Sequence, residues 1–186
     1  MPETLSIEER RTLLAIAREA ITAILDGRRF QLPEVTGVLA EKRGAFVTLN
    51  QRNSGDLRGC IGYIEPLFPL AETVSRAAVA AALHDRRFEP VLPPELDGLT
   101  IEISVLSLPA PIRPEEVTVG VHGLIIRLGG RSGLLLPQVA TEYGWDAETF
   151  LQHTCHKAGL PADTWRQPEA ELLAFSATVF GEEERP

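Results

Sequence analysis

Two segments of this chain share one order of elements: two short apolar strands, a proline and a helical stretch. In the first, residues 45–49 alternate between apolar and more polar side chains, and the turn-forming run RNSGD at 52–56 separates them from a second strand at 57–64. In the second, the run GLIIRLGGRSGLLLP at 123–137 places two apolar strands around Gly-Gly-Arg-Ser. Strands joined by a short Gly-containing loop pair antiparallel. The order therefore predicts an α+β fold, a mainly antiparallel sheet with flanking helices.

The same order predicts how the chain is organised. The 186 residues suffice for one domain, because a chain of about this size buries roughly 70% of its unfolded surface. We expect a single domain of two intimately packed subdomains, with hairpin–helix units at about 43–84 and 122–158. Two further strands are predicted, a central one in LTIEISVLS at 99–107 and a long one in AELLAFSATVF at 170–180.

An amphipathic helix is predicted for residues 6–26. Ser6 stands where it can cap the first turn, and Glu9, three residues later, completes a capping box. Apolar residues recur at helical spacing along the segment, and Gly27 follows as the residue that ends it. We expect this helix to serve packing.

Charge and cysteine content narrow the classes of function. The net charge of −8 argues against broad nucleic-acid binding, which needs a positive field to replace counterions. No apolar run approaches the roughly 20 residues that span a bilayer, and the acidic start MPETLSIEERR lacks the pattern of a secretory signal. The two cysteines, Cys60 and Cys155, lie far apart, so no disulfide framework is expected and a cytoplasmic location fits best.

The stretch DLRGCIGYIEP at 56–66 carries a cysteine between two glycines, with an arginine two residues before it. Alternate residues of a regular strand share a face, so Arg58, Cys60 and Gly62 are expected on one side. A guanidinium beside a thiol favours the reactive thiolate, and Gly62 would leave open space next to it. This pattern predicts a small notch that attracts anions and holds a soft nucleophile or metal ligand.

A structural role explains the same residues. Free cysteines are among the most buried residue types, and glycines within a strand often mark a bulge or the close approach of another backbone. The residues alone therefore leave two interpretations of Cys60 open, a reactive thiol and a packed strand residue.

The hexapeptide LRGCIG at 57–62 resembles the signature of the AMMECR family, also called protein A of the AmmeMemoRadiSam system. Further blocks resemble that family in the same order: GAFVTL before the hexapeptide, and DRRFEPV, HGLIIR, LLPQVATEYGWD and FLQHTCHKAGLPADTW after it. The resemblance extends over nearly the whole chain, from about residue 5 to 180.

The resemblance implies an α/β architecture of two subdomains and an activity that is undetermined. It also implies two partners, a Memo-like relative of non-haem iron dioxygenases and a radical S-adenosylmethionine enzyme. In this family the hexapeptide is the suspected functional site. The residues carried over on that ground are Cys60 and Arg58 as the reactive pair, with Leu57, Gly59, Ile61 and Gly62 as binding residues.

The run DRRF at 85–88 follows the alanine-rich helix and is expected to return near Cys60. Arg87 is a candidate second ligand for an anion. The alternative is a local ion pair with Asp85 or Glu89 that holds an irregular segment, which is the usual role of loop charges.

Other polar residues are expected to have ordinary structural roles. Glu102 and Ser104 share one face of a strand and are expected to be solvated, with lining of the Cys60 cavity as the alternative. The glycines of GGRSG at 129–133 are expected to form a hairpin turn. His122 is expected in a turn, and His84 at the C-terminus of a helix.

The segment HTCHK at 153–157 suggests metal binding, since His153 and His156 are one helical turn apart. However, Cys155 falls on the apolar side of the predicted helix and the histidines on the opposite side, so the three cannot meet one ion. The sequence predicts no metal site and identifies no cofactor. The few aromatic residues are scattered, which predicts no stacking platform for single-stranded nucleic acid.

Three classes of function follow. The first is an enzyme or enzyme subunit whose pocket at the LRGCIG hairpin acts on a small molecule or protein together with the Memo-like and radical S-adenosylmethionine partners. The second is a non-catalytic interaction module in which LRGCIG is a structural strand. The third and weakest is a nucleic-acid-related regulator, which the negative charge disfavours.

Overall fold

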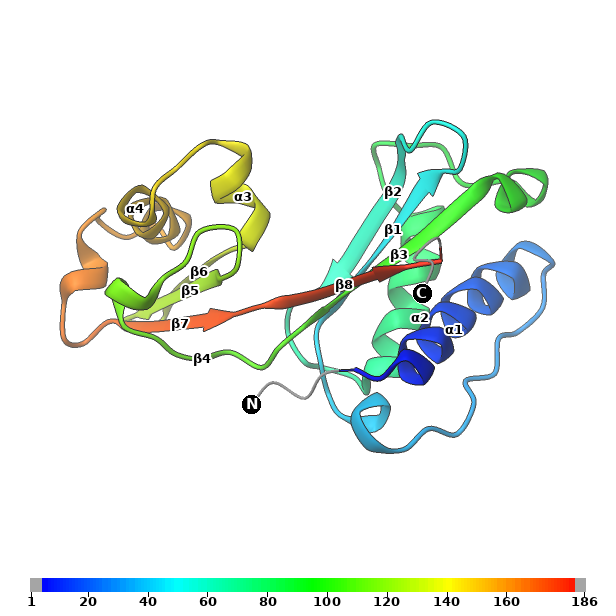
Figure 1. The fold of residues 1–186 in the computed structure, drawn as a ribbon, viewed down its shortest axis with the longest axis horizontal. Helices are drawn as coiled ribbons and strands as arrows, with labels where there is room; N and C mark the ends of the chain where they lie inside the picture. Colours follow the sequence, from blue (N-terminus) through cyan, green and yellow to red (C-terminus); the bar gives the residue numbers. More distant parts are fainter. Residues whose placement is uncertain (1–4, 183–186) are drawn as a thin grey trace. The chain divides into compact units, whose positions relative to one another are not determined.

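A computed structural model describes residues 5–182, which form two compact units (Figure 1). The first unit comprises the chain up to Leu106 and again from Thr178, and the second comprises Ser107–Ala177. The first predicted hairpin–helix segment lies in one unit and the second lies in the other. The mixture of helices and antiparallel strands that the sequence predicts is confirmed.

The first unit contains a four-stranded sheet in the order β2-β1-β3-β8, in which β1 pairs antiparallel with both β2 and β3. The predicted central strand is therefore confirmed as β3, between β1 and β8. The elements of this unit are α1 (Ile7–Leu25), η1 (Gly37–Ala40), β1 (Ala45–Gln51), β2 (Leu57–Tyr63), α2 (Leu70–Leu83), η2 (Pro93–Gly98), β3 (Leu99–Leu106) and β8 (Ala177–Gly181).

Helix α1 begins and ends as its sequence predicts. The Ser6 side chain accepts a hydrogen bond from the Glu9 amide at 3.2 Å, and the Glu9 carboxylate accepts one from the Ser6 amide at 2.8 Å. This reciprocal pair satisfies two amides that a helix start leaves without intrahelical partners. Gly27 follows with a φ of 69°, a left-handed conformation that glycine adopts readily. None of the helices within residues 5–182 is both long and apolar enough to cross a membrane.

Helices α1 and α2 pack against one face of the first sheet (Figure 1). Strand β2 and helix α2 approach each other closely: a Cβ atom at Gly59 of β2 would collide with the backbone oxygen of Ala81 in α2. The absence of a side chain at Gly59 and the small side chains of α2 allow this approach. The core between the helices and the sheet is built from fully buried side chains of α1, α2, β1 and β3. These include Leu13 and Ile21 of α1, Ala77 and Ala78 of α2, Val47 and Leu49 of β1, and Ile101 and Ile103 of β3.

The second unit has its own four-stranded sheet, in the order β4-β7-β5-β6. The hairpin between β5 and β6 turns at Gly129 and Gly130, whose φ angles are 55° and 79°. Positive φ at both central residues is what a type I′ turn requires, so the turn predicted at GGRSG is confirmed. The elements are β4 (Ala110–Pro111), η3 (Pro114–Glu116), β5 (Gly123–Leu128), β6 (Arg131–Leu135), α3 (Pro137–Glu142), α4 (Ala147–Lys157), η4 (Thr164–Arg166) and β7 (Glu171–Phe175).

The long strand predicted for residues 170–180 is wrong, because this segment forms two strands in two sheets. Strand β7 pairs with β5 in the second sheet, whereas β8 belongs to the first sheet. The break falls at Ser176, whose amide donates to Ser107 Oγ at 2.9 Å and whose carbonyl accepts from the Ser107 amide at 2.9 Å. A continuous apolar run does not show which sheet each of its residues will join, so the pattern alone could not place this break.

Candidate functional site

The two faces of the first sheet differ in composition. The face toward α1 and α2 carries the apolar core residues, including Val47 and Ile103. Because side chains alternate along a strand, the intervening residues point to the opposite side. We call that side the polar face; its side chains are Phe46, Thr48 and Asn50 of β1, Cys60 of β2, and Thr100, Glu102 and Ser104 of β3.

A thiol, a hydroxyl and a carboxylate form a row across this polar face. Thr48 is the cross-strand partner of Cys60 on one side and of Glu102 on the other. Directly opposed residues have Cβ atoms about 4.5–5.5 Å apart, so their side chains are neighbours. The Thr48 hydroxyl donates to Cys60 Sγ at 3.2 Å, and Cys60 is only partly buried. The row therefore presents a thiol whose sulfur faces a hydrogen-bond donor.

The backbone of Cys60 is held from outside the sheet. Strand β2 is an edge strand, so its outward amides have no strand to bond to. Asp85, in the segment after α2, takes that place: its Oδ2 accepts from the Cys60 amide at 2.9 Å. The Asp85 side chain is only 5% exposed. The expectation that the DRRF run returns near Cys60 is therefore confirmed.

Arg87 forms a two-pronged ion pair with Asp85. Its Nε lies 3.0 Å from Oδ1 and its Nη2 lies 2.7 Å from Oδ2. Hydrogen bonding to Arg87 holds the pKa of Asp85 well below its usual range although burial opposes this. The pKa of Arg87 is raised, mainly by Asp85 and to a lesser degree by the charge of Cys60. The local ion pair predicted for Arg87 is confirmed, and the Arg87 side chain stays 57% exposed.

Arg58 departs from the regular strand that the sequence predicted. The register pairs Leu49 with Gly59 and then Asn50 with Leu57, so Arg58 stands opposite no residue of β1. Such a bulge leaves Arg58 outside the regular pairing of β1 with β2. The guanidinium instead pairs with Glu95 of η2, with Nη2 3.2 Å from Oε1. The partner that approaches Cys60 directly is Asp85, with Arg87 bound to it.

The remaining hexapeptide residues are explained by packing. A Cβ atom at Gly62 would collide with the ring of Phe46, so the open space expected beside Gly62 is filled, which corrects that prediction. Gly59 lies against α2, and Ile61 packs on the first core. Leu57 is 39% exposed at the start of the strand.

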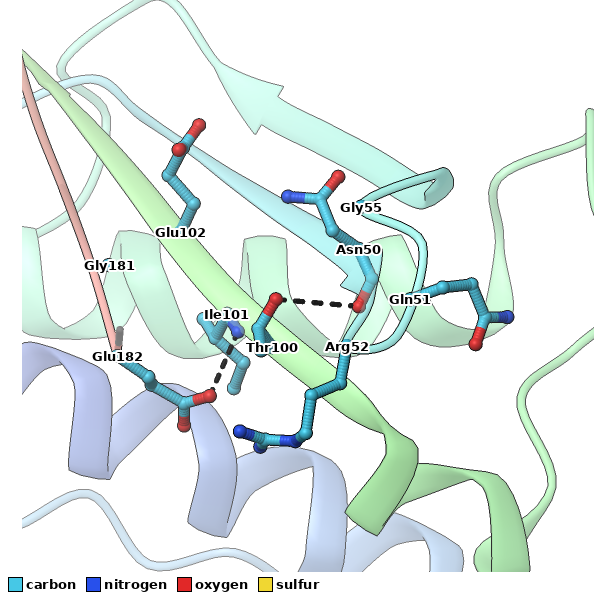
Figure 2. A pocket seen from close by; sticks show the side chains of 9 residues that line it. All are labelled: Asn50, Gln51, Arg52, Gly55, Thr100, Ile101, Glu102, Gly181 and Glu182. Carbon is cyan, nitrogen blue, oxygen red and sulfur yellow. Dashed lines mark hydrogen bonds between the residues drawn. The ribbon is translucent and has the colours of Figure 1, made fainter. Parts of the chain in front are cut away.

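A cavity of about 300 Å³ opens where β1, the β1–β2 loop, β3 and β8 meet (Figure 2). Asn50 and Glu102 both point to one side of the sheet there. The Glu182 carboxylate accepts from the Ile101 amide at 2.9 Å on the other side. The loop end of the predicted hairpin, rather than residues 57–62, contributes to this cavity. Its lining residues are Asn50, Gln51, Arg52, Gly55, Thr100, Ile101, Glu102, Gly181 and Glu182.

The histidines and Cys155 of α4 separate as predicted. Cys155 is fully buried, and His153 stacks on the Trp145 ring with centroids 3.9 Å apart. Tyr143 also stacks on Trp145, with ring centroids 5.0 Å apart. These aromatic rings are therefore less scattered than the sequence suggested. Within residues 5–182, no three His, Cys, Asp or Glu side chains are grouped to hold a metal ion.

The histidines outside α4 have the expected structural roles. His84 is the C-cap of α2. His122 closes a turn by accepting the Thr118 amide at Nδ1 at 3.0 Å.

Comparison with known proteins shows the family and the fold of this chain. The family model AMMECR1 matches residues 14–180. A protein of Methanothermobacter thermautotrophicus is 49% identical over 96% of this chain and 97% of its own length, and Protein MK0488 of Methanopyrus kandleri is 47% identical over 99% and 93%. The crystal structure of the uncharacterized protein PH0010 of Pyrococcus horikoshii is 45% identical, with a TM-score of 0.72 over 92% of this chain and 90% of that one. The chain belongs to the AMMECR1 family.

Proposed function

We propose that this protein is an enzyme, or a subunit of one, in which the Cys60 thiol reacts with substrate on the polar face. The observation that carries the proposal is the 3.2 Å contact from the Thr48 hydroxyl to the sulfur of a partly exposed cysteine. A donor aimed at sulfur orients it and stabilises negative charge that develops there. Asp85 fixes the Cys60 backbone at the same point. The thiol is thus held from two directions and remains open to solvent.

The chemistry open to such a thiol is nucleophilic. The sulfur supplies the electron pair of a new bond to an electrophilic atom of the substrate, the substrate's leaving group departs with the pair of the bond that breaks, and the thiol proton passes to water.

The proposal includes the two partners that the resemblance implies. We propose that the protein acts together with a Memo-like protein and a radical S-adenosylmethionine protein, and that the substrate is a small molecule or a protein. Membership of the AMMECR1 family supports this part of the proposal.

A second candidate is a non-catalytic interaction module in which the hexapeptide is a structural strand. The observation in its favour is that packing accounts for Gly59, Ile61 and Gly62 without any ligand. Edge strand β2 also ends near exposed apolar side chains, with Ile64 38% and Leu67 53% exposed. Such side chains beside an edge strand suit contact with another protein.

Thiol labelling tests the first candidate. We expect a small neutral reagent, methyl methanethiosulfonate, to modify one thiol per folded chain. The Cys60→Ser variant should lose this labelling, whereas Cys155→Ser should keep it because Cys155 is fully buried. Labelling of Cys60 only after denaturation would contradict a reactive thiol.

Co-purification separates the two candidates. Wild type and Cys60→Ser are each mixed with the Memo-like and radical S-adenosylmethionine proteins of the same organism. An intact complex that loses turnover in Cys60→Ser supports chemistry at the thiol. Loss of the complex itself in that variant supports the interaction module.

A further inference from the structure

Glu102 differs from the other carboxylates around the polar face. Two of these hold an arginine: Asp85 binds Arg87 at 2.7 Å and Glu95 binds Arg58 at 3.2 Å. On the other side of the sheet, Glu182 binds Arg18 at 2.6 Å. The Glu102 carboxylate forms no hydrogen bond or ion pair with any residue between 5 and 182. Its charge is therefore the one in this group that the described protein does not neutralise.

The position of Glu102 is central to the site. It lies on β3, an internal strand, directly across from Thr48, and Thr48 contacts Cys60. Two strand spacings of about 4.8 Å separate the backbones of Glu102 and Cys60, or roughly 10 Å. A substrate a few bonds long can therefore touch Glu102 and Cys60 at once.

The Asn50 side chain adds a second polar group to the same place. It projects from β1 to the side of the sheet on which Glu102 projects (Figure 2). Within residues 5–182 the Asn50 amide group makes no side-chain hydrogen bond; the Thr100 hydroxyl donates to the Asn50 backbone oxygen at 3.5 Å. Both groups border the cavity of about 300 Å³. The cavity thus offers a carboxylate, which only accepts, beside an amide that also accepts.

These groups determine what kind of ligand can bind. A ligand that covers Glu102 removes water from its carboxylate, which is costly unless the ligand supplies a donor and a positive charge. An anionic group would instead meet uncompensated negative charge. Of the nearby guanidinium groups, Arg87 is bound by Asp85. The Arg52 guanidinium lines the same cavity but points, like Glu182, to the side of the sheet opposite Glu102 and Asn50 (Figure 2). The local charge balance therefore favours a cation.

We infer that the polar face binds a primary ammonium group of the substrate, held by Glu102 and Asn50 within reach of Cys60. This inference rests on the proposed function, since it names the substrate class of the same site. The ammonium belongs either to a small amine or to a lysine side chain of a protein. The recognising chemistry is the same in both cases.

A series of thiol reagents that differ only in charge tests the inference. The aminoethyl methanethiosulfonate carries a positive charge with hydrogen-bond donors, and the trimethylammonioethyl reagent carries a positive charge without a donor. The methyl reagent is neutral, and the sulfonatoethyl reagent is negatively charged. We expect Cys60 labelling rates to fall in that order. Glu102→Gln should slow the aminoethyl reagent relative to the methyl reagent by between about twofold and roughly sixteenfold, the effect of one charge at about 10 Å for an effective dielectric constant between about 80 and about 20.

Two controls accompany this series. Glu8→Gln removes a carboxylate from α1, on the helix side of the first unit, and should leave the order of rates unchanged. The neutral methyl reagent should label Glu102→Gln at least as fast as wild type, because loss of a nearby negative charge does not disfavour the thiolate, and this shows that the fold and the thiol are intact. Equal labelling by all four reagents in wild type would overturn the inference while leaving a reactive Cys60. Absence of labelling by any reagent would overturn the proposed function and the inference with it.

Protection against the neutral reagent assigns the source of the ammonium group. n-Butylamine and Nα-acetyl-lysine methylamide are compared at equal concentration in wild type and in Glu102→Gln. Slower labelling of wild type with both compounds supports a small amine, and slower labelling with the lysine derivative alone supports a protein lysine. Protection should be lost in Glu102→Gln. Protection by neither compound would overturn the inference. The charge of the protein would then attract cationic reagents, but the polar face would have no binding site for an ammonium group.

Discussion

Asp85 and Cys60 are joined by a hydrogen bond of 2.9 Å between residues 25 positions apart, from the Cys60 amide to Asp85 Oδ2. The bond closes the outer side of edge strand β2 at the cysteine. The same carboxylate accepts the backbone amide and guanidinium of Arg87, so one buried side chain organises both the strand edge and the following segment. Asp85 therefore contributes both to the stability of the folded protein and to the position of the Cys60 thiol.

Replacing Asp85 by asparagine should destabilise the protein. The two oxygens of Asp85 accept hydrogen bonds from the Cys60 amide and from two nitrogens of the Arg87 guanidinium. An asparagine side chain has one oxygen and no charge, so it loses charge-assisted hydrogen bonds at a buried position. We expect a decrease of about 2 kcal/mol in the free energy of unfolding. Urea denaturation followed by circular dichroism measures it. Asp56→Asn, in the exposed β1–β2 loop, is the matched control, and an equal loss in the two variants would contradict the role of Asp85.

The pKa of Asp85 also predicts a pH dependence. Because its folded pKa is lowered, mainly by hydrogen bonding to Arg87, the unfolded state binds the proton more readily. The stabilisation is present above the unfolded pKa of about 3.9 and is lost as the pH falls toward the folded pKa. We expect wild type to lose more unfolding free energy than Asp85→Asn between pH 7 and pH 3. Parallel pH curves for the two proteins would refute this.

Gly59→Ala should destabilise the first unit. The new methyl group would collide with the backbone oxygen of Ala81, and neither backbone can move without disturbing the sheet or α2. Overpacking of this kind costs about 1–3 kcal/mol. Gly98→Ala is the control, since nothing lies within 4 Å of a Cβ at that position. Thermal unfolding of both variants makes the comparison, and similar melting temperatures would rule out the close approach of β2 and α2.

Thr48→Val should slow the labelling of Cys60 by the neutral reagent. The substitution keeps the size of the side chain but removes the hydroxyl that donates to the sulfur at 3.2 Å. Loss of a hydrogen bond worth about 1 kcal/mol corresponds to roughly a fivefold lower rate. Thr100→Val removes a hydroxyl from the next strand of the same face and should leave the rate unchanged. If both variants react like wild type, Thr48 does not assist the thiol.

Local features of the chain could be predicted because their causes lie within a few residues. The capping box of Ser6 and Glu9 and the positive φ angles of Gly129 and Gly130 involve only near neighbours. Alternation of apolar residues placed β1 and β3, since a strand with one buried face has a period of two. The LRGCIG resemblance led to the family to which the chain belongs.

The candidate site was only partly predictable, because the register of a strand depends on contacts with segments that are distant in the chain. The bulge at Arg58 shifts the pairing of β2 with β1 by one residue, so Leu57 and not Arg58 stands opposite Asn50. The glycines of LRGCIG are typical of a bulge, but they do not show at which residue the bulge falls. The sequence therefore paired Arg58 with Cys60, whereas the structure bonds Arg58 to Glu95.

The sequence by itself determined most of the helices and strands, the antiparallel class of the sheets and the cysteine at the centre of the candidate site. Only the tertiary structure decided that Asp85 binds the Cys60 amide, that Glu102 and Cys60 flank Thr48, and that the chain changes sheets at Ser176. The physical reason is that periodicity and turn chemistry act between near neighbours. Strand order and register instead depend on packing among segments far apart in the chain.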